Sequence, residues 1–296
     1  MAPSGSGTSL PDGVGRLVMR IGTTSFIYPG GWLYNVERLA PDFDDLEILF
    51  FEADGPGAFP GTEECRGLAA CKQTHALSYS LHTPLQASLA SLEPARRAAG
   101  VAAVLRAIDR AAALEPEHYV LHVYLGDGER SPRPSDLDAW RERATLSLRE
   151  LLAHGIPSRK LCVELLDYDF GLIEPVIEAL DLSIALDIGH LVRDSRDELA
   201  ELQRYLPRTR IIQWHGTDPS GRDHRSLGFY PRARARELLR TLAAHAYTGV
   251  LTLEVFDQVE LDSSRALLTE LLAELAAAGT ASPHGSQRWV EPRTPT

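Results

Sequence analysis

The chain has 296 residues, of which 44% are hydrophobic and 24% charged, and its formal net charge is −11 at pH 7. These values are ordinary for a globular protein and allow one large barrel or two smaller domains. The acidic balance argues against a nucleic-acid-binding protein, because phosphate contacts generally require a basic face.

The cysteines and the first residues of the chain indicate the cellular compartment. Cys65, Cys71 and Cys162 are odd in number and form no CxxC pair, which favours a reducing compartment. The first 18 residues lack the apolar core of a signal peptide, and no run approaches the roughly 18 apolar residues of a membrane helix. We therefore expect a cytoplasmic protein with no membrane partner.

Residues 1–18, rich in Gly, Ser and Pro, are predicted to be a disordered arm, residues 19–278 a catalytic domain, and residues 279–296 a tail.

Eight short apolar or β-branched runs follow one another along this central part. They lie at 20–26, 45–52, 77–84, 118–126, 160–167, 182–190, 209–216 and 249–256. Their nearly continuous apolar character is typical of buried parallel strands. Stretches with helical spacing separate them, most clearly at 91–114 and 233–246. The alternation predicts an α/β protein that forms a single (β/α)8 TIM barrel. A doubly wound open sheet is the alternative, but it usually has fewer strands, and no GxGxxG follows the first run.

Most of these predicted strands end in an acid or a histidine, at the face where such barrels carry their active sites. In chain order the candidates are Glu52, His82, His122, Glu164, Asp187 with His190, His215 and Glu254, while Asp223 and His224 follow the seventh strand. One such histidine is more often a hydrogen-bonded structural residue. Together, however, these groups would be costly to bury, because burial and like charges disfavour ionised carboxylates. A divalent cation removes the conflict, so the sequence predicts a metal centre.

The number of candidate ligands bears on the chemistry. One ion is satisfied by Glu164, Asp187, His215 and Glu254, and the additional His82, His122, His190 and His224 indicate two or three ions. Clustered ions suit phosphoester hydrolysis. A single ion suits aldose–ketose chemistry, in which two carboxylates move a proton beside a polarised carbonyl. Trp214 and Tyr124 are candidates to line the pocket, although aromatic residues in barrel strands usually serve packing.

These motifs resemble those of the xylose isomerase-like barrels, which include the apurinic endonuclease family 2 and its endonuclease IV members. The resemblance rests on LHTP at His82, VLH at His122, VEL at Glu164, LDIGH at Asp187 and His190, WHGTD at His215, HRSLG at His224 and LEV at Glu254. It implies that these residues bind a cluster of zinc ions that cleaves a phosphodiester. One position departs from the pattern: the family has an Asp two residues before the histidine of H-x-x-[IL]-G, whereas this chain has Arg222 there, with Asp223 directly before His224. The third ion therefore lacks its matching ligand.

The first two predicted strands are similar to a narrower family, the cobamide-remodelling phosphodiesterases. The matching segments are GTTSFIYP (22–29), NVERLA (35–40), DDLEILFFE (44–52) and YVLH (119–122). The resemblance implies a hydrolase that opens the nucleotide loop of a small-molecule cobamide, with two or three zinc or manganese ions and no nucleic-acid partner. Glu164 and Glu254 would be catalytic, and Glu52, Trp214, Arg222 and Asp223 would contact substrate.

A corrin ring is wide and partly apolar, so it requires an open mouth. Phe26, Tyr28, Trp32 and Phe51 are placed to line it, or else they pack the first helix. Three other functions stay open: a sugar isomerase or epimerase with one Mn²⁺ or Mg²⁺, an apurinic endonuclease, and a binding module that has lost catalysis.

Overall fold

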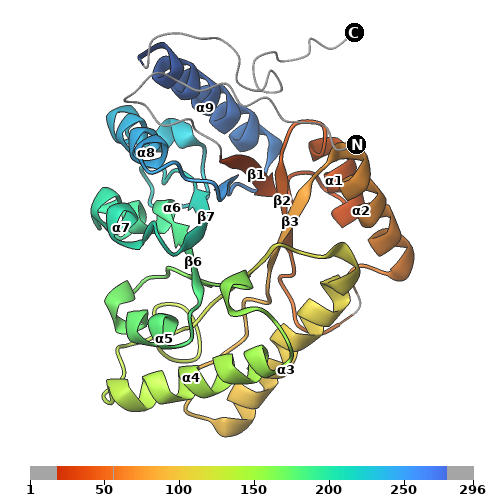
Figure 1. Cartoon of the computed structure of the whole chain (residues 1–296), viewed down its shortest axis with the longest axis vertical. Helices are drawn as coiled ribbons and strands as arrows, with labels where there is room; N and C mark the ends of the chain where they lie inside the picture. Colours follow the sequence, from red (N-terminus) through yellow and green to blue (C-terminus); the bar gives the residue numbers. More distant parts are fainter. Residues whose placement is uncertain (1–18, 56, 279–296) are drawn as a thin grey trace, which may run out of the picture.

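Eight parallel strands close into a barrel in sequence order, with β8 hydrogen-bonded to β1 (Figure 1). The computed structural model describes residues 19–55 and 57–278, so the predicted arm (1–18) and tail (279–296) lie outside the described residues. The strands are β1 (Arg20–Thr24), β2 (Asp45–Leu49), β3 (Ser78–His82), β4 (His118–Leu121), β5 (Leu161–Glu164), β6 (Ser183–Asp187), β7 (Thr209–Trp214) and β8 (Val250–Leu253). The predicted TIM barrel is confirmed.

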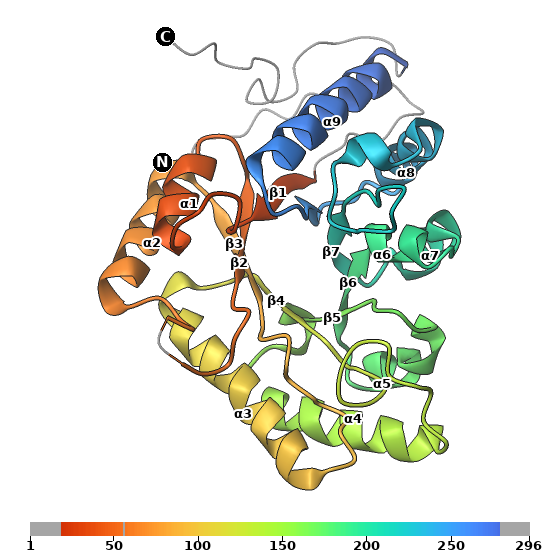
Figure 2. The same ribbon diagram turned by 180° about the vertical axis from the view of Figure 1, so that it is seen from behind.

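Helices surround the barrel on its outside, as the views from the front and from behind both show (Figures 1 and 2). They are α1 (Trp32–Leu39), α2 (Thr62–His75), α3 (Pro94–Ala111), α4 (Leu137–Ala153), α5 (Glu174–Ala179), α6 (Ile188–Arg193), α7 (Glu198–Tyr205), α8 (Arg232–Ala244) and α9 (Gln258–Ala278). Short 3-10 turns occupy Ala112–Leu114, Ser158–Lys160, Phe170–Leu172 and Leu227–Phe229. Among the described residues, no helix is both long and apolar enough to cross a membrane.

Local sequence signals account for these helices. In α3, Pro94 occupies the first turn, where a missing N–H costs nothing, and Val101, Val104 and Ile108 recur at helical spacing and are buried. α4 begins after Asp136, whose side chain accepts a hydrogen bond from the Ala139 amide at 2.9 Å. Such a cap contributes about 1 kcal/mol. α3 therefore buries an apolar face and leaves its polar face outside.

The predicted strands extend beyond the observed ends, and in two of them this moves a candidate residue off the strand. β2 ends at Leu49, so Glu52 lies in the following loop, where it is exposed. β6 ends at Asp187, and His190 lies on α6 instead of at a strand end. In both cases the apolar character continues past the point where inter-strand pairing stops, so hydropathy alone could not locate the end.

Candidate metal centre

The barrel interior changes from apolar to polar toward the carboxyl ends of the strands. A separate apolar cluster inside the barrel consists of Val120, Cys162, Ala185, Ile211 and Val250, one from each of β4 to β8. Side chains two positions apart share a face of a strand. The next inward positions on the same strands are therefore polar, and they are His122, Glu164, Asp187, Gln213 and Thr252. His215 and Glu254 follow at the ends of β7 and β8, so the fold itself gathers the chemistry at one mouth.

The first group of side chains is the His82 cluster, which comprises His82, His122 and Glu164 from the ends of β3, β4 and β5. Its donor atoms lie within 4.8 Å of one another, and all three residues are buried. Oε2 of Glu164 lies 3.1 Å from Nε2 of His82 and 2.8 Å from Nε2 of His122. Two imidazole nitrogens thus face one carboxylate oxygen.

The opposite nitrogens of the two imidazoles show which atoms carry hydrogen. Nδ1 of His82 lies 2.9 Å from the Thr83 carbonyl oxygen, which can only accept, so Nδ1 is the donor. Nδ1 of His122 lies 2.6 Å from the hydroxyl of Tyr124, and that hydroxyl donates to the Leu85 carbonyl oxygen. The neutral forms of both rings therefore present bare Nε2 lone pairs to the carboxylate. A cation or protons must lie between them.

The second group is the His215 cluster, which comprises Asp187, His215 and Glu254. Nε2 of His215 lies 3.3 Å from Oδ1 of Asp187, and Nδ1 of His190 lies 3.0 Å from Oδ2. These contacts lack hydrogen-bond geometry: Oδ2 of Asp187, Nδ1 of His190, Nε2 of His215 and Oε2 of Glu254 are all buried without a hydrogen-bond partner. Glu164, Asp187 and His190 form a further close group, which joins this cluster to the His82 cluster.

The segment LDIGH places two of these ligands at a strand-to-helix junction. Asp187 ends β6 and caps α6, because its Oδ1 accepts a hydrogen bond from the His190 amide at 2.8 Å. This bond starts α6 at the end of β6 and keeps His190 next to Asp187, with Nδ1 of His190 3.0 Å from Oδ2. Gly189 leaves room for the neighbouring ring, since a Cβ there would lie 2.1 Å from Cε1 of His215. The glycine is therefore required by close packing against a candidate ligand.

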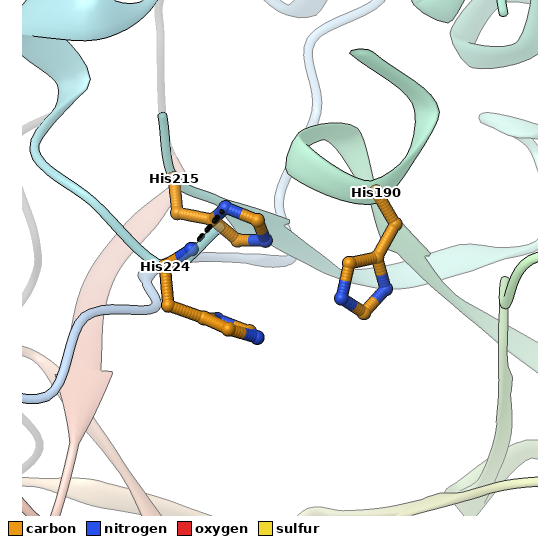
Figure 3. Close-up of side chains that lie close together, drawn as sticks. All are labelled: His190, His215 and His224. Atoms are coloured by element: carbon orange, nitrogen blue, oxygen red, sulfur yellow. Dashed lines mark hydrogen bonds between the residues drawn. The ribbon is translucent and has the colours of Figure 1, made fainter. Parts of the chain in front are cut away.

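A third group at the rim consists of His190, His215 and His224, whose rings face a shared space in Figure 3. The His224 amide donates to Nδ1 of His215 at 2.9 Å, drawn as the dashed line in Figure 3. The Gly216 carbonyl oxygen lies 3.2 Å from the same nitrogen and accepts from it in the alternative tautomer, the one that leaves Nε2 bare for a metal. The two bonds exclude each other, and a metal on Nε2 would require the second.

Asp223 occupies the rim beside this triple-histidine group. Its Oδ2 lies 2.7 Å from Nη1 of Arg193 and 3.8 Å from Nε2 of His190. Burial raises the pKa of Asp223, but the hydrogen bond from Arg193 and the charge of His224 hold it below its usual value. Asp223 is thus an ionised carboxylate within reach of the group, one residue after Arg222, the position at which the chain departs from the family motif.

Electrostatics in the clusters reflect unbalanced charge. Burial raises the pKa of Glu254 well above its usual range, and the charges of Asp187 and Glu47 raise it further. Burial lowers the pKa of His82, but its hydrogen bond and charge interaction with Glu164 outweigh this and raise it to about 9. Burial also lowers the pKa of His224, to about 4. Without cations, the negative charge of the buried carboxylates is therefore offset by protons on Glu254 and His82, whereas His224 stays neutral.

Glu47 and Gln213 are buried polar residues of the barrel that the sequence analysis did not identify. Glu47 lies in the middle of β2, and neither of its carboxylate oxygens has a hydrogen-bond partner. Gln213 on β7 donates from Nε2 to Oε1 of Glu254 at 3.3 Å. The sequence signal for Glu47 is a charged residue inside the apolar strand DLEIL, where alternation places it on the same face as Asp45 and Leu49.

Three of the predicted substrate contacts lie away from the close groups of ligands. Glu52 is exposed in the loop after β2. Trp214 is fully buried on the outer side of β7 and packs edge-on against Tyr230, because inward-facing Gln213 and His215 flank it. Arg222 is largely exposed and pairs with Asp218 at 2.8 Å. The eight predicted metal ligands, by contrast, all lie in the close groups described above.

The chain is similar to known proteins over most of its length. Residues 40–276 match the family model described as xylose isomerase-like TIM barrel. A D-tagatose 3-epimerase-like protein shares 19% identity with a TM-score of 0.71, over 87% of this chain and 98% of that one. The 3-keto-D-glucoside 4-epimerase of E. coli shares 17% identity with a TM-score of 0.65, over 86% of this chain and 99% of that one. Endonuclease IV of Thermus thermophilus shares 20% identity with a TM-score of 0.62, over 85% of this chain and 99% of that one. No curated protein matches the sequence significantly. Identities this low show the fold alone.

Proposed function

We propose that this chain, which belongs to the family of xylose isomerase-like TIM barrels, is a metal-dependent phosphodiesterase with two adjoining ion sites. The observation that carries the proposal is the His82 cluster. A single-ion enzyme is complete with Glu164, Asp187, His215 and Glu254, and it has no use for two more imidazoles aimed at the same carboxylate. The group of Glu164, Asp187 and His190 joins this cluster to the His215 cluster.

The residues present fit divalent ions. Buried atoms without hydrogen-bond partners are rare in folded proteins. Here four of them gather among the candidate ligands, and they are carboxylate oxygens and imidazole nitrogens, which zinc and manganese accept: Oδ2 of Asp187, Nδ1 of His190, Nε2 of His215 and Oε2 of Glu254. Nδ1 of His82 and Nδ1 of His122 donate hydrogen bonds to the Thr83 carbonyl oxygen and the Tyr124 hydroxyl, and outer hydrogen bonds of this kind usually orient metal-bound histidines.

Bound ions supply positive charge that stabilises the phosphoryl oxygens and lowers the pKa of a water. The chain's own residues hold and orient the groups around them. The Tyr124 hydroxyl and the Thr83 carbonyl fix two imidazoles, and the Gln213 amide holds Oε1 of Glu254. Arg193 holds Asp223 beside His190 at the open rim, where a substrate enters.

The proposed substrate is a cobamide, cleaved in its nucleotide loop. This choice rests on the resemblance of residues 22–52 to cobamide-remodelling phosphodiesterases. A small phosphodiester requires no basic stripe on the protein, which agrees with the net charge of −11.

The direct test is to incubate the protein anaerobically with an adenosylated cobamide and zinc or manganese, and to look for a cobinamide-type product. We expect turnover by the wild type and at least a hundredfold loss in His122→Ala, which leaves the His215 cluster intact. Absence of any product with either metal contradicts the proposal. Equal turnover by the variant removes the His82 cluster from the reaction.

A second candidate is a sugar isomerase or epimerase with one ion. The comparisons favour it over the cobamide hypothesis, because two of the similar structures are described as sugar epimerases. Glu164 and Glu254 would then bind the ion and move the proton. Epimerisation of D-tagatose or D-fructose with one ion per chain supports this candidate, and it would leave the His82 cluster without a role.

The endonuclease alternative rests on the similarity to endonuclease IV. Cleavage of duplex DNA at an abasic site, with binding that weakens steeply as salt rises, would support it.

A further inference from the structure

We propose that Phe26, Phe51 and Phe256 form an aromatic platform at the barrel mouth that binds a flat, conjugated ring of the substrate. This inference deepens the proposed phosphodiesterase function and rests on it. The three residues lie two or three positions after the ends of β1, β2 and β8, which are neighbours in the barrel. Their side chains therefore start from the same rim as the metal ligands.

The three rings contact one another in an unbroken row. The Phe26 and Phe51 centroids are 5.0 Å apart with the planes at 81°, and those of Phe51 and Phe256 are 6.3 Å apart with the planes at 63°. Such edge-to-face contacts hold aromatic rings in fixed relative positions. The row is thus a preformed surface instead of three separate side chains.

The platform continues into the candidate metal centre. The Phe256 ring lies 4.9 Å from the ring of His224, and His224 belongs to the triple-histidine group. A ligand that places its phosphate at the clusters and extends over His224 therefore meets Phe256 first, then Phe51 and Phe26. This continuity identifies the occupant as another part of the same small molecule.

Exposure at this position points to a ligand. Phe26 is 48% exposed, although Ser25 and Ile27 beside it are buried, and Phe51 and Phe256 are half-buried. Leaving such rings in water forgoes the burial energy of an aromatic side chain, and exposed apolar surface with polar groups beside it is typical of binding sites. A simple sugar offers little flat apolar area for three phenyl rings, whereas a conjugated macrocycle does.

The test measures binding without catalysis. Dicyanocobinamide lacks the nucleotide loop, and cyanide occupies both axial positions of its cobalt, so protein histidines do not ligate it. Equilibrium dialysis with metal-depleted protein, read by the absorbance of the corrin, gives the dissociation constant. We expect Phe26→Ala and Phe51→Leu each to weaken binding about fivefold or more, as the loss of one aromatic contact predicts.

Tyr34→Ala is the matched control, because Tyr34 is 42% exposed on α1 and its ring is covered by the Arg38 guanidinium. It should leave the dissociation constant unchanged. No binding by the wild type, or equal binding by the wild type and both platform variants, overturns the platform. No bond is cleaved in this assay, so its result does not depend on catalysis. If the protein binds the corrin but does not hydrolyse a cobamide, the platform stands and the proposed phosphodiesterase function is contradicted.

Discussion

Replacing Glu47 by Gln should stabilise the metal-free protein at neutral and alkaline pH. Glu47 is completely buried and both its oxygens lack hydrogen-bond partners. Burial raises its pKa from 4.5 to about 8; the charge of His82 lowers it, and that of Glu164 raises it further. The folded state therefore accepts the protonated carboxyl and disfavours the ionised one. Glutamine has nearly the same shape and cannot ionise.

The size of the effect follows from linkage between protonation and folding. Because the pKa is raised on folding, Glu47 causes no penalty below pH 4.5, and its penalty grows as the pH rises until it becomes constant above about pH 8. At ~1.4 kcal/mol per pH unit, the upper bound is about 5 kcal/mol above pH 8 and about 3 kcal/mol at pH 7. Divalent ions in the neighbouring clusters offset the negative charge and should reduce this difference.

Urea unfolding of metal-depleted wild type and Glu47→Gln at pH 5 and pH 8 measures the effect. We expect similar midpoints at pH 5 and a clearly higher midpoint for the variant at pH 8. Glu52→Gln, an exposed position in the next loop, is the control and should change neither. A variant that is no more stable than the wild type at pH 8 refutes the reasoning, because Glu47 would then have a compensating partner.

Three substitutions test the candidate ligands separately. His122→Ala should lower bound metal by one ion per chain, measured by elemental analysis, while the ion at the His215 cluster remains. Gly189→Ala places a Cβ 2.1 Å from Cε1 of His215. Calorimetric titration should therefore show that the affinity of the His215 cluster for metal falls at least tenfold. An unchanged affinity would show that the ring can move aside. Tyr124→Phe removes the hydroxyl that accepts the hydrogen bond from Nδ1 of His122. Loss of such an outer contact typically weakens metal binding ~10–100-fold. Wild-type metal affinity in the variant would mean that the His122 tautomer with hydrogen on Nδ1 needs no such support.

The sequence predicted the barrel, and it predicted the gathering of the eight candidate ligands, for one physical reason. Eight apolar runs separated by helices specify closed parallel topology, and in that topology all strands end at one mouth. Whatever polar residue follows an apolar run, such as His82, Glu164 or Glu254, is then brought to that mouth without knowledge of contacts.

The residues that the structure places elsewhere share another reason, which is that hydropathy does not show where a strand ends or which way a side chain faces. Glu52 is the carboxylate that closes the apolar run and so was the candidate, although Glu47, within β2, is the buried one. Trp214 was considered for the pocket, although alternation from His215 places it outside. The pairing of Asp223 with Arg193 joins α6 to the loop after β7, a contact that no local pattern indicates.

The number of metal ions per chain tests the central claim most directly, because only the presence of both clusters distinguishes this centre from a single-ion one. Elemental analysis of protein purified without chelator should give at least two equivalents of zinc or manganese per chain. A single equivalent that is retained in full by His82→Ala and His122→Ala would contradict the account and leave the His215 cluster, with Glu164, as a one-ion site.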